Sequence, residues 1–235
     1  MKDEEIDNVL KNATQPQQHP DPLVLARIGE SIRPSMRPVR PLPPAWLMIV
    51  CLVLVCAAVS LAGAARAGFF GFERMDWFER LLVFSTIAIL TWLGAISFAR
   101  QMIPASRHRI SPGAQLALSS VALLAVFACL FRDYHTDHFV PAGIACLLTG
   151  LLHAIPADLL CWLLLSRGFA VNRVSAGLVS GTLAGLAGVG MLELHCPSFQ
   201  ATHILIWHTA VVPVSAALSA MLCWALPFRG RSNHR

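Results

Sequence analysis

Cysteine and histidine are the residues of this chain best suited to chemistry. The sequence has seven cysteines, at positions 51, 56, 129, 146, 161, 196 and 223. No two of them form a Cys-x-x-Cys pair, so neither a zinc ribbon nor a thioredoxin-like motif is indicated. Thiols that meet in an oxidising compartment can form a disulfide, and they react only where water reaches them. The role of each cysteine therefore depends on where the fold places it.

Metal-ligand residue types gather around one cysteine. The segment Glu-Leu-His-Cys-Pro at residues 193–197 is followed by His203, and His135 and His138 lie upstream. Thiolate with imidazole suits zinc, cadmium or copper. No regular ligand spacing appears, however, and interfacial histidines are common without a metal. We therefore expect neither a metal site nor a cofactor.

Three further ionisable residues, His153, Asp158 and His208, lie within long apolar segments. A charge at bilayer depth costs several kcal/mol unless it is paired or hydrated. Such residues either line a proton or ion path or form structural hydrogen bonds between helices, and with so few carboxylates the sequence favours the structural role.

Catalytic signatures are absent from the sequence. It contains no Gly-x-Ser-x-Gly elbow, no His-Glu-x-x-His motif, no Walker lysine and no Gly-x-Gly-x-x-Gly segment after a strand. We therefore expect a protein that is not an enzyme.

The elements that position these residues are predicted to be membrane-spanning helices. Hydrophobic residues make up 56% of the chain, charged residues 13%, and the mean hydropathy is +0.62. A helix needs roughly 20 apolar residues to cross a bilayer. The sequence predicts an all-α, polytopic membrane protein, a bundle of six transmembrane helices in the lipid bilayer, at residues 46–65, 81–99, 113–131, 140–165, 174–192 and 204–226.

Arginine placement predicts the orientation of this bundle. Twelve arginines fall before the first span, in alternate loops and after the sixth span, and four fall in the other loops. Because cationic loops stay in the cytoplasm, both termini are predicted to be cytoplasmic. The net charge of +5 is explained by these short inner loops, so no direct nucleic-acid partner is expected. No signal peptide is indicated, since the first apolar run starts at Trp46.

This topology sorts the cysteines. Cys146 lies near the outer end of span four and Cys196 just beyond the outer end of span five, so the two can share one face of the membrane. Cys129 also falls near the outer end of its span. An outer-side pair could form a disulfide, and the alternative is that the cysteines are small apolar residues of helices.

Residues 1–45 form a separate cytoplasmic tail rich in proline, ahead of a membrane domain at 46–227 and a short tail at 228–235. Two short amphipathic helices are predicted in it, the second starting at Asp21-Pro22. Both are too short to be stable alone in water, so their apolar faces need a partner protein, each other or the membrane surface. The apolar positions are Ile6, Val9, Leu10, Leu23, Leu25, Ile28 and Ile32.

A family resemblance is carried by residues 143–213. They include Gly-Ile-Ala-Cys ending at Cys146, Pro156 within the span, Leu-Leu-Leu-Ser-Arg-Gly, Leu-Glu-Leu-His-Cys-Pro around Cys196, and Trp207-His208. In order and spacing these resemble the family of negative regulators of sigma factor F, bacterial inner-membrane anti-sigma factors with six spans. The resemblance covers roughly residues 44 to 226.

The resemblance implies that the cytoplasmic tail holds an extracytoplasmic-function sigma factor at the membrane. It also implies that Cys146 and Cys196 face the periplasm and sense oxidative or heavy-metal stress. The tail is longer and richer in proline than the family pattern, so its partner-binding residues rest on position and amphipathicity. A small transporter or channel subunit using His153, Asp158 and His208 is the alternative. An intramembrane enzyme using His195, Cys196 and His208 is a weaker one.

Overall fold

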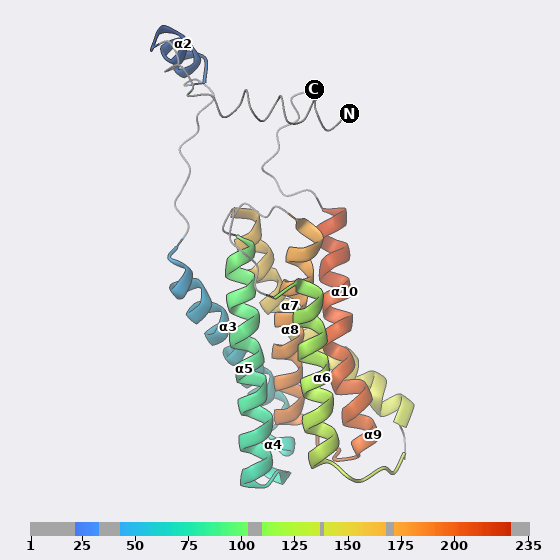
Figure 1. Cartoon of the computed structure of the whole chain (residues 1–235). Helices are drawn as coiled ribbons and strands as arrows, with labels where there is room; N and C mark the ends of the chain where they lie inside the picture. The colour runs from blue at the N-terminus through green and yellow to red at the C-terminus, as the bar shows by residue number, and fades with distance from the viewer. Residues whose placement is uncertain (1–21, 33–42, 103–109, 137–138, 168–171, 227–235) are drawn as a thin grey trace, which may run out of the picture. The chain divides into compact units, whose positions relative to one another are not determined.

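The computed structural model describes residues 22–32, 43–102, 110–136, 139–167 and 172–226 of the chain, which are almost wholly helical. The chain divides into two compact units, Met1–Pro41 and Leu42–Arg235. The first contains helix α2, Pro22–Ile32. The second is a helical bundle (Figure 1) built from α3 Ala45–Ala67, α4 Phe70–Arg74, α5 Trp77–Gln101, α6 Pro112–Leu130, α7 Phe139–Arg167, α8 Arg173–His195, α9 Ala201–His203, the π-helix η2 Ile204–His208, and α10 Thr209–Ala225.

Six segments of the bundle are long and apolar enough to cross a membrane, which confirms the predicted fold class. They are α3, α5, α6, α7 from Phe139 to Ser166, α8, and the run from Ala201 to Ala225. The predicted boundaries differ from the observed ones most at the start of α5. There Asp76 accepts a hydrogen bond from the backbone N–H of Glu79, and the Glu79 side chain accepts one from the backbone of Asp76. This capping box starts the helix before its apolar run begins.

Helix α8 is the centre of the bundle. In an apolar stretch of 18 residues of α8, 83% of the residues are buried inside the protein. In the corresponding stretches of α6 and α7 the share is 22%. Its glycines allow α10 to approach closely, as the Gly-x-x-x-Gly spacing predicts. A Cβ atom added to Gly177 would lie 2.8 Å from the Ala220 Cα, and one added to Gly185 would lie 2.8 Å from the Val212 Cα.

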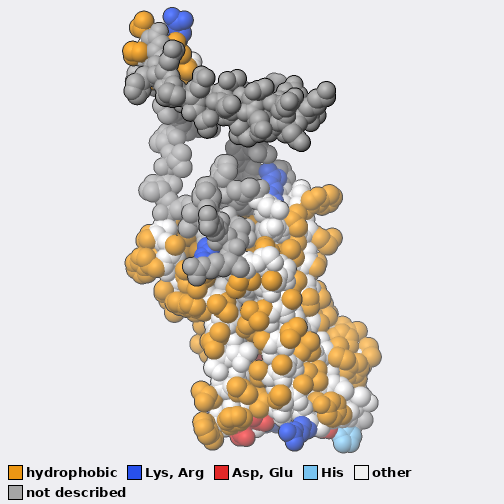
Figure 2. All heavy atoms as spheres, in the orientation of Figure 1, with side chains coloured by type: hydrophobic (Ala, Val, Ile, Leu, Met, Phe, Trp, Pro, Cys, Tyr) orange, Lys and Arg blue, Asp and Glu red, His pale blue; other side chains and the backbone are white. Residues whose placement is uncertain are grey.

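The outer surface of the bundle matches a membrane environment. Figure 2 shows hydrophobic side chains over the sides of the bundle, with acidic, basic and histidine side chains gathered at the end where α4 and α9 lie. We call this the α4–α9 end. Exposed charged residues of this end include Glu73, Arg74, Asp76 and Asp133. The apolar sides and polar end are those expected of helices that cross a bilayer.

Candidate functional site

The structure brings Cys146 and Cys196 together at the α4–α9 end. Cys146 lies two turns into α7 and is half-buried, and Cys196 follows the last residue of α8 and is buried. Their sulfur atoms are 3.7 Å apart and both thiols are free. A disulfide has an S–S distance of about 2.05 Å, so closing the bond requires the sulfurs to approach by ~1.7 Å.

Proline places Cys196 at the end of α8. The residue before a proline is disfavoured in the α conformation, and Cys196 accordingly has φ −67° and ψ 121°. The chain after Cys196 packs against α4, where the Nη1–H of Arg74 donates to the Pro197 carbonyl at 2.7 Å. Gly71 of α4 sits so close that an added Cβ atom would lie 2.8 Å from the Cys196 carbonyl oxygen. This packing fixes the thiol and shields it.

The surroundings of Cys196 shift the pKa of its thiol. Its hydrogen bond with the Cys146 thiol and its burial raise its pKa above the ordinary value, and the contact with His203 opposes this shift. Because the thiolate is the reactive form, the raised pKa slows the oxidation of Cys196 without preventing it.

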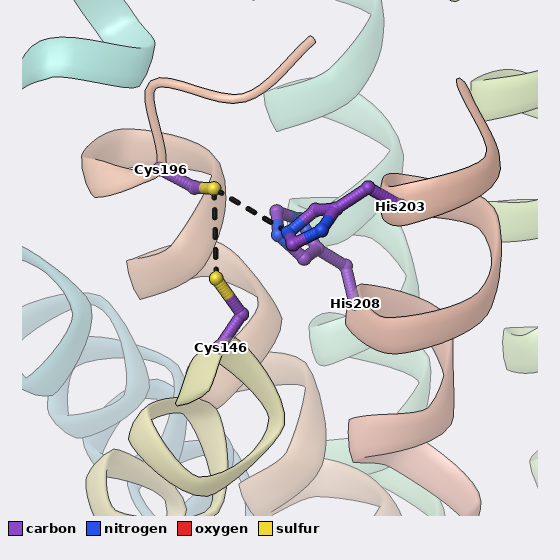
Figure 3. Close-up of side chains that lie close together, drawn as sticks. All are labelled: Cys146, Cys196, His203 and His208. Atoms are coloured by element: carbon purple, nitrogen blue, oxygen red, sulfur yellow. Dashed lines mark hydrogen bonds between the residues drawn. The ribbon is translucent and has the colours of Figure 1, made fainter. Parts of the chain in front are cut away.

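Two histidines converge on the same thiols (Figure 3). His203 ends α9 and His208 ends η2, and their rings lie 5.3 Å apart in a T-shaped arrangement. The His203 Nε2 is 3.7 Å from the Cys196 sulfur. An α-helix turns about 100° per residue, so residues five apart would point about 140° apart. The π-helix, with its i→i+5 bonding, brings these two onto one face.

A buried carboxylate holds the second histidine. The Nδ1–H of His208 donates to Glu193 Oε1 at 2.6 Å, and both side chains are only 1% exposed. The span predicted from the sequence ends at residue 192, whereas α8 continues to His195 and carries Glu193 inside the bundle. The carboxylate fixes the ring, so the opposite Nε2 atom faces the cysteines.

Four ligand-type side chains therefore meet. One ligand atom each from Cys146, Cys196, His203 and His208 lies within 4.8 Å of the others. This group could not be predicted from spacing along the sequence, because its members come from α7, the loop after α8, α9 and η2. The available signal was residue type alone: histidines clustered after a cysteine.

The comparisons with known proteins identify the family. A family described as negative regulator of sigma F matches residues 33–226, most of the chain. The chain belongs to this family. No curated protein and no solved structure matches it. The resemblance seen in residues 143–213 is thus confirmed, and the protein is a negative regulator of a sigma factor. Its six long helices are apolar enough to cross a membrane.

Other chemistry-bearing residues of this family member lie outside the four-residue group. His195 donates through Nδ1–H to the Gly68 carbonyl at 3.2 Å and is not among the four side chains that meet. His135 is exposed and pairs with Asp133. That contact lowers the pKa of the Asp133 carboxyl. Cys129 is exposed. His138 lies outside the described residues.

The three residues of the transporter alternative have different partners. Asp158 Oδ1 accepts hydrogen bonds from Ser180 of α8 at 2.6 Å and from Ser219 of α10 at 2.9 Å. His153 donates to the Thr149 carbonyl one turn earlier in α7. Asp158 thus has the structural role favoured by the sequence, as a polar link between three helices.

The candidate partner-binding residues fall partly on α2. Leu23, Leu25 and Ile28 are 73%, 52% and 48% exposed, and Ile32 is the last residue of the helix. Ile6, Val9 and Leu10 lie outside the described residues. The family match begins at residue 33, so it does not extend over α2.

Proposed function

We propose that this protein is an anti-sigma factor of the bacterial inner membrane that sequesters an extracytoplasmic-function sigma factor through its cytoplasmic tail, residues 1–45. Oxidative or heavy-metal stress at the periplasmic face, sensed by Cys146 and Cys196, releases the sigma factor. The proposal rests on the meeting of two thiols, 3.7 Å apart, in a member of a sigma-regulating family.

The tail supplies the binding surface in this proposal. Large apolar side chains of α2 are exposed within their own unit, and water is a poor environment for them. Burial against a partner is worth about 1.5–3 kcal/mol for each such side chain. Sequestration denies the bound sigma surface to core polymerase.

The thiol pair supplies the sensor. Hydrogen peroxide would oxidise the two thiols to one disulfide and be reduced to two water molecules, with both thiol protons passing into the water. A metal ion would act without oxidation, by displacing the protons from the thiols. Either event ties the start of α7 to the end of α8.

Transmission through the bundle follows from the packing of α8. This helix contacts α7, α10 and α3, so a shift at its α4–α9 end is shared with all three. The chain before α3 leads to the tail, and α3 packs on α8 through Ser60, whose hydroxyl donates to the Ala187 carbonyl at 2.7 Å. Packed helices pass on such a shift when they have two discrete arrangements.

Co-purification of the sigma factor with the full-length protein in detergent tests the proposal. Wild type is compared with a deletion of residues 1–45, a Leu23→Asp plus Ile28→Asp variant, and a Cys146→Ser plus Cys196→Ser variant, each with and without peroxide. We expect the first two to lose at least about a hundredfold in affinity, from the apolar burial they remove. The cysteine variant should bind and ignore peroxide.

Cys129→Ser is the matched control, because Cys129 is an exposed cysteine near the end of α6, just before the loop that leads into α7. It should bind the sigma factor and release it with peroxide as wild type does. Failure of the wild type to bind any extracytoplasmic-function sigma factor would refute the proposal. Release from the double cysteine variant would refute the sensor alone.

A further inference from the structure

We propose that Cys146, Cys196, His203 and His208 form a four-coordinate site for a divalent ion of the zinc group, Zn²⁺ or Cd²⁺. The inference deepens the proposed function by naming the ligands of the metal that would be sensed. Metal binding itself needs no sigma factor, so the two proposals can fail separately.

The separations between ligand atoms fit a tetrahedral ion. With Zn–S bonds of about 2.3 Å and Zn–N bonds of about 2.05 Å, two sulfurs should lie about 3.8 Å apart and a sulfur and a nitrogen about 3.6 Å apart. The Cys146 and Cys196 sulfurs are 3.7 Å apart, and the Cys196 sulfur and His203 Nε2 are also 3.7 Å apart. Two edges of the tetrahedron are therefore already formed.

The fourth ligand, His208, points a buried nitrogen at this place. Its Nε2 atom has no hydrogen-bond partner among the described residues, although the side chain is 1% exposed. An unpaired buried polar atom is costly, and a metal ion would satisfy it. Figure 3 shows both imidazoles directed from their helices towards the two sulfurs.

Glu193 provides the supporting contact that metal-bound histidines usually have. Its carboxylate accepts the Nδ1–H of His208 at 2.6 Å, which leaves Nε2 as the free ligand atom. Carboxylate–histidine–zinc arrangements of this kind fix the ring orientation and raise the basicity of the ligand. Glu193 is here a positioning residue and not a ligand.

The donor set and its burial define the ion and its use. Two thiolates with two imidazoles favour soft or borderline ions over Mg²⁺ or Ca²⁺. Cys196, His203 and His208 are buried and only Cys146 is half-buried, so four protein ligands close the site and leave no position for a substrate. Binding converts M²⁺ and two thiols into a metal dithiolate and two protons, with no change in oxidation state. A disulfide would remove both thiolates, so oxidation and metal binding exclude each other.

Cobalt titration of the reduced, full-length protein in detergent tests this site. Tetrahedral Co²⁺ with sulfur ligands has characteristic visible absorption, and Zn²⁺ and Cd²⁺ should abolish it by displacement. We expect one ion per chain, at least tenfold weaker binding in Cys146→Ser and His203→Gln, and roughly 10–100-fold weaker binding in Glu193→Gln. Cys129→Ser and His153→Gln, which alter residues outside the group, should bind as wild type.

Folding of each variant is checked by its elution as a single species and by its melting temperature. His203→Cys separates ligation from structure, because it replaces one ligand by another and should retain the cobalt spectrum. Zn²⁺ should raise the melting temperature of the wild type more than that of His203→Gln. The site is disproved if wild type binds no Co²⁺. Equal binding by wild type and His203→Gln would also overturn it, because the cysteines would then bind without the histidines.

Discussion

At the scale of single residues, the decisive feature is the buried hydrogen bond between Glu193 and His208. The side chains of Glu193 and His208 are each 1% exposed, and His208 Nδ1 and Glu193 Oε1 are 2.6 Å apart. Removing the carboxylate leaves the buried Nδ1–H of His208 without an acceptor, which costs more than the hydrogen bond itself contributes to stability. The pair therefore fixes the position of His208 firmly.

Glu193→Ala should lower the free energy of unfolding in detergent by about 1–3 kcal/mol, because the His208 Nδ1–H loses its acceptor. Glu193→Gln retains an acceptor oxygen and should lose much less. Unfolding by added denaturing detergent, followed by circular dichroism, measures both. Equal loss in the two variants would mean that the volume of the side chain matters and its hydrogen bond does not.

At the scale of elements, the glycines of α8 decide how the bundle packs. Gly177, Gly181 and Gly185 lie four residues apart and face the backbone of α10. Because a Cβ atom at Gly181 would meet the Ser215 carbonyl and the Ala216 Cα, the helices can come this close only without a side chain there. Close approach in turn positions Ser219 and Ser180 to donate to Asp158.

Gly181→Ala should therefore destabilise the bundle by about 1–3 kcal/mol, the usual cost of an added group in a tightly packed interior. Gly113→Ala is the matched control, because an added Cβ at this position of α6 has nothing within 4 Å. Denaturing-detergent titration of both variants measures the difference. Unchanged stability in Gly181→Ala would contradict the close packing of α8 and α10.

At the scale of the whole molecule, the two ends of the bundle differ in charge, and this sets the proposed orientation. In the sequence, the loops of the α4–α9 end contain four arginines together with acidic residues, and the other loops and the two terminal segments contain twelve. Positively charged loops remain in the cytoplasm. The thiol pair and the N-terminal tail are accordingly assigned to opposite sides of the membrane, which suits a sensor that reports inward.

Alkaline phosphatase fusions measure this orientation, because the enzyme is active only when exported. A fusion after Tyr134, in the loop before α7, should be active, and a fusion after Ser166, at the end of α7, should be inactive. The reversed pattern would place Cys146 and Cys196 on the cytoplasmic side and remove the basis for periplasmic sensing.

Local properties of the sequence were sufficient for the spans. Hydropathy over about 20 residues identifies a membrane helix whatever its neighbours are, because the bilayer sets the length. The alternation of spans then places Cys146 and Cys196 at the same end, and glycine spacing indicates the tight face of α8. The family resemblance was likewise contained in short motifs between residues 143 and 213.

The metal-ligand group was decided only by the tertiary structure. His203 and His208 would diverge on a regular α-helix, and the π-helix that aligns them is not visible in residue spacing. The span predicted from the sequence ends at residue 192, and only the structure shows that α8 continues past it and buries Glu193. The sequence thus determined which side chains lie near the α4–α9 end of the bundle. Their meeting within 4.8 Å depends on how α7, α8 and the last span pack in three dimensions.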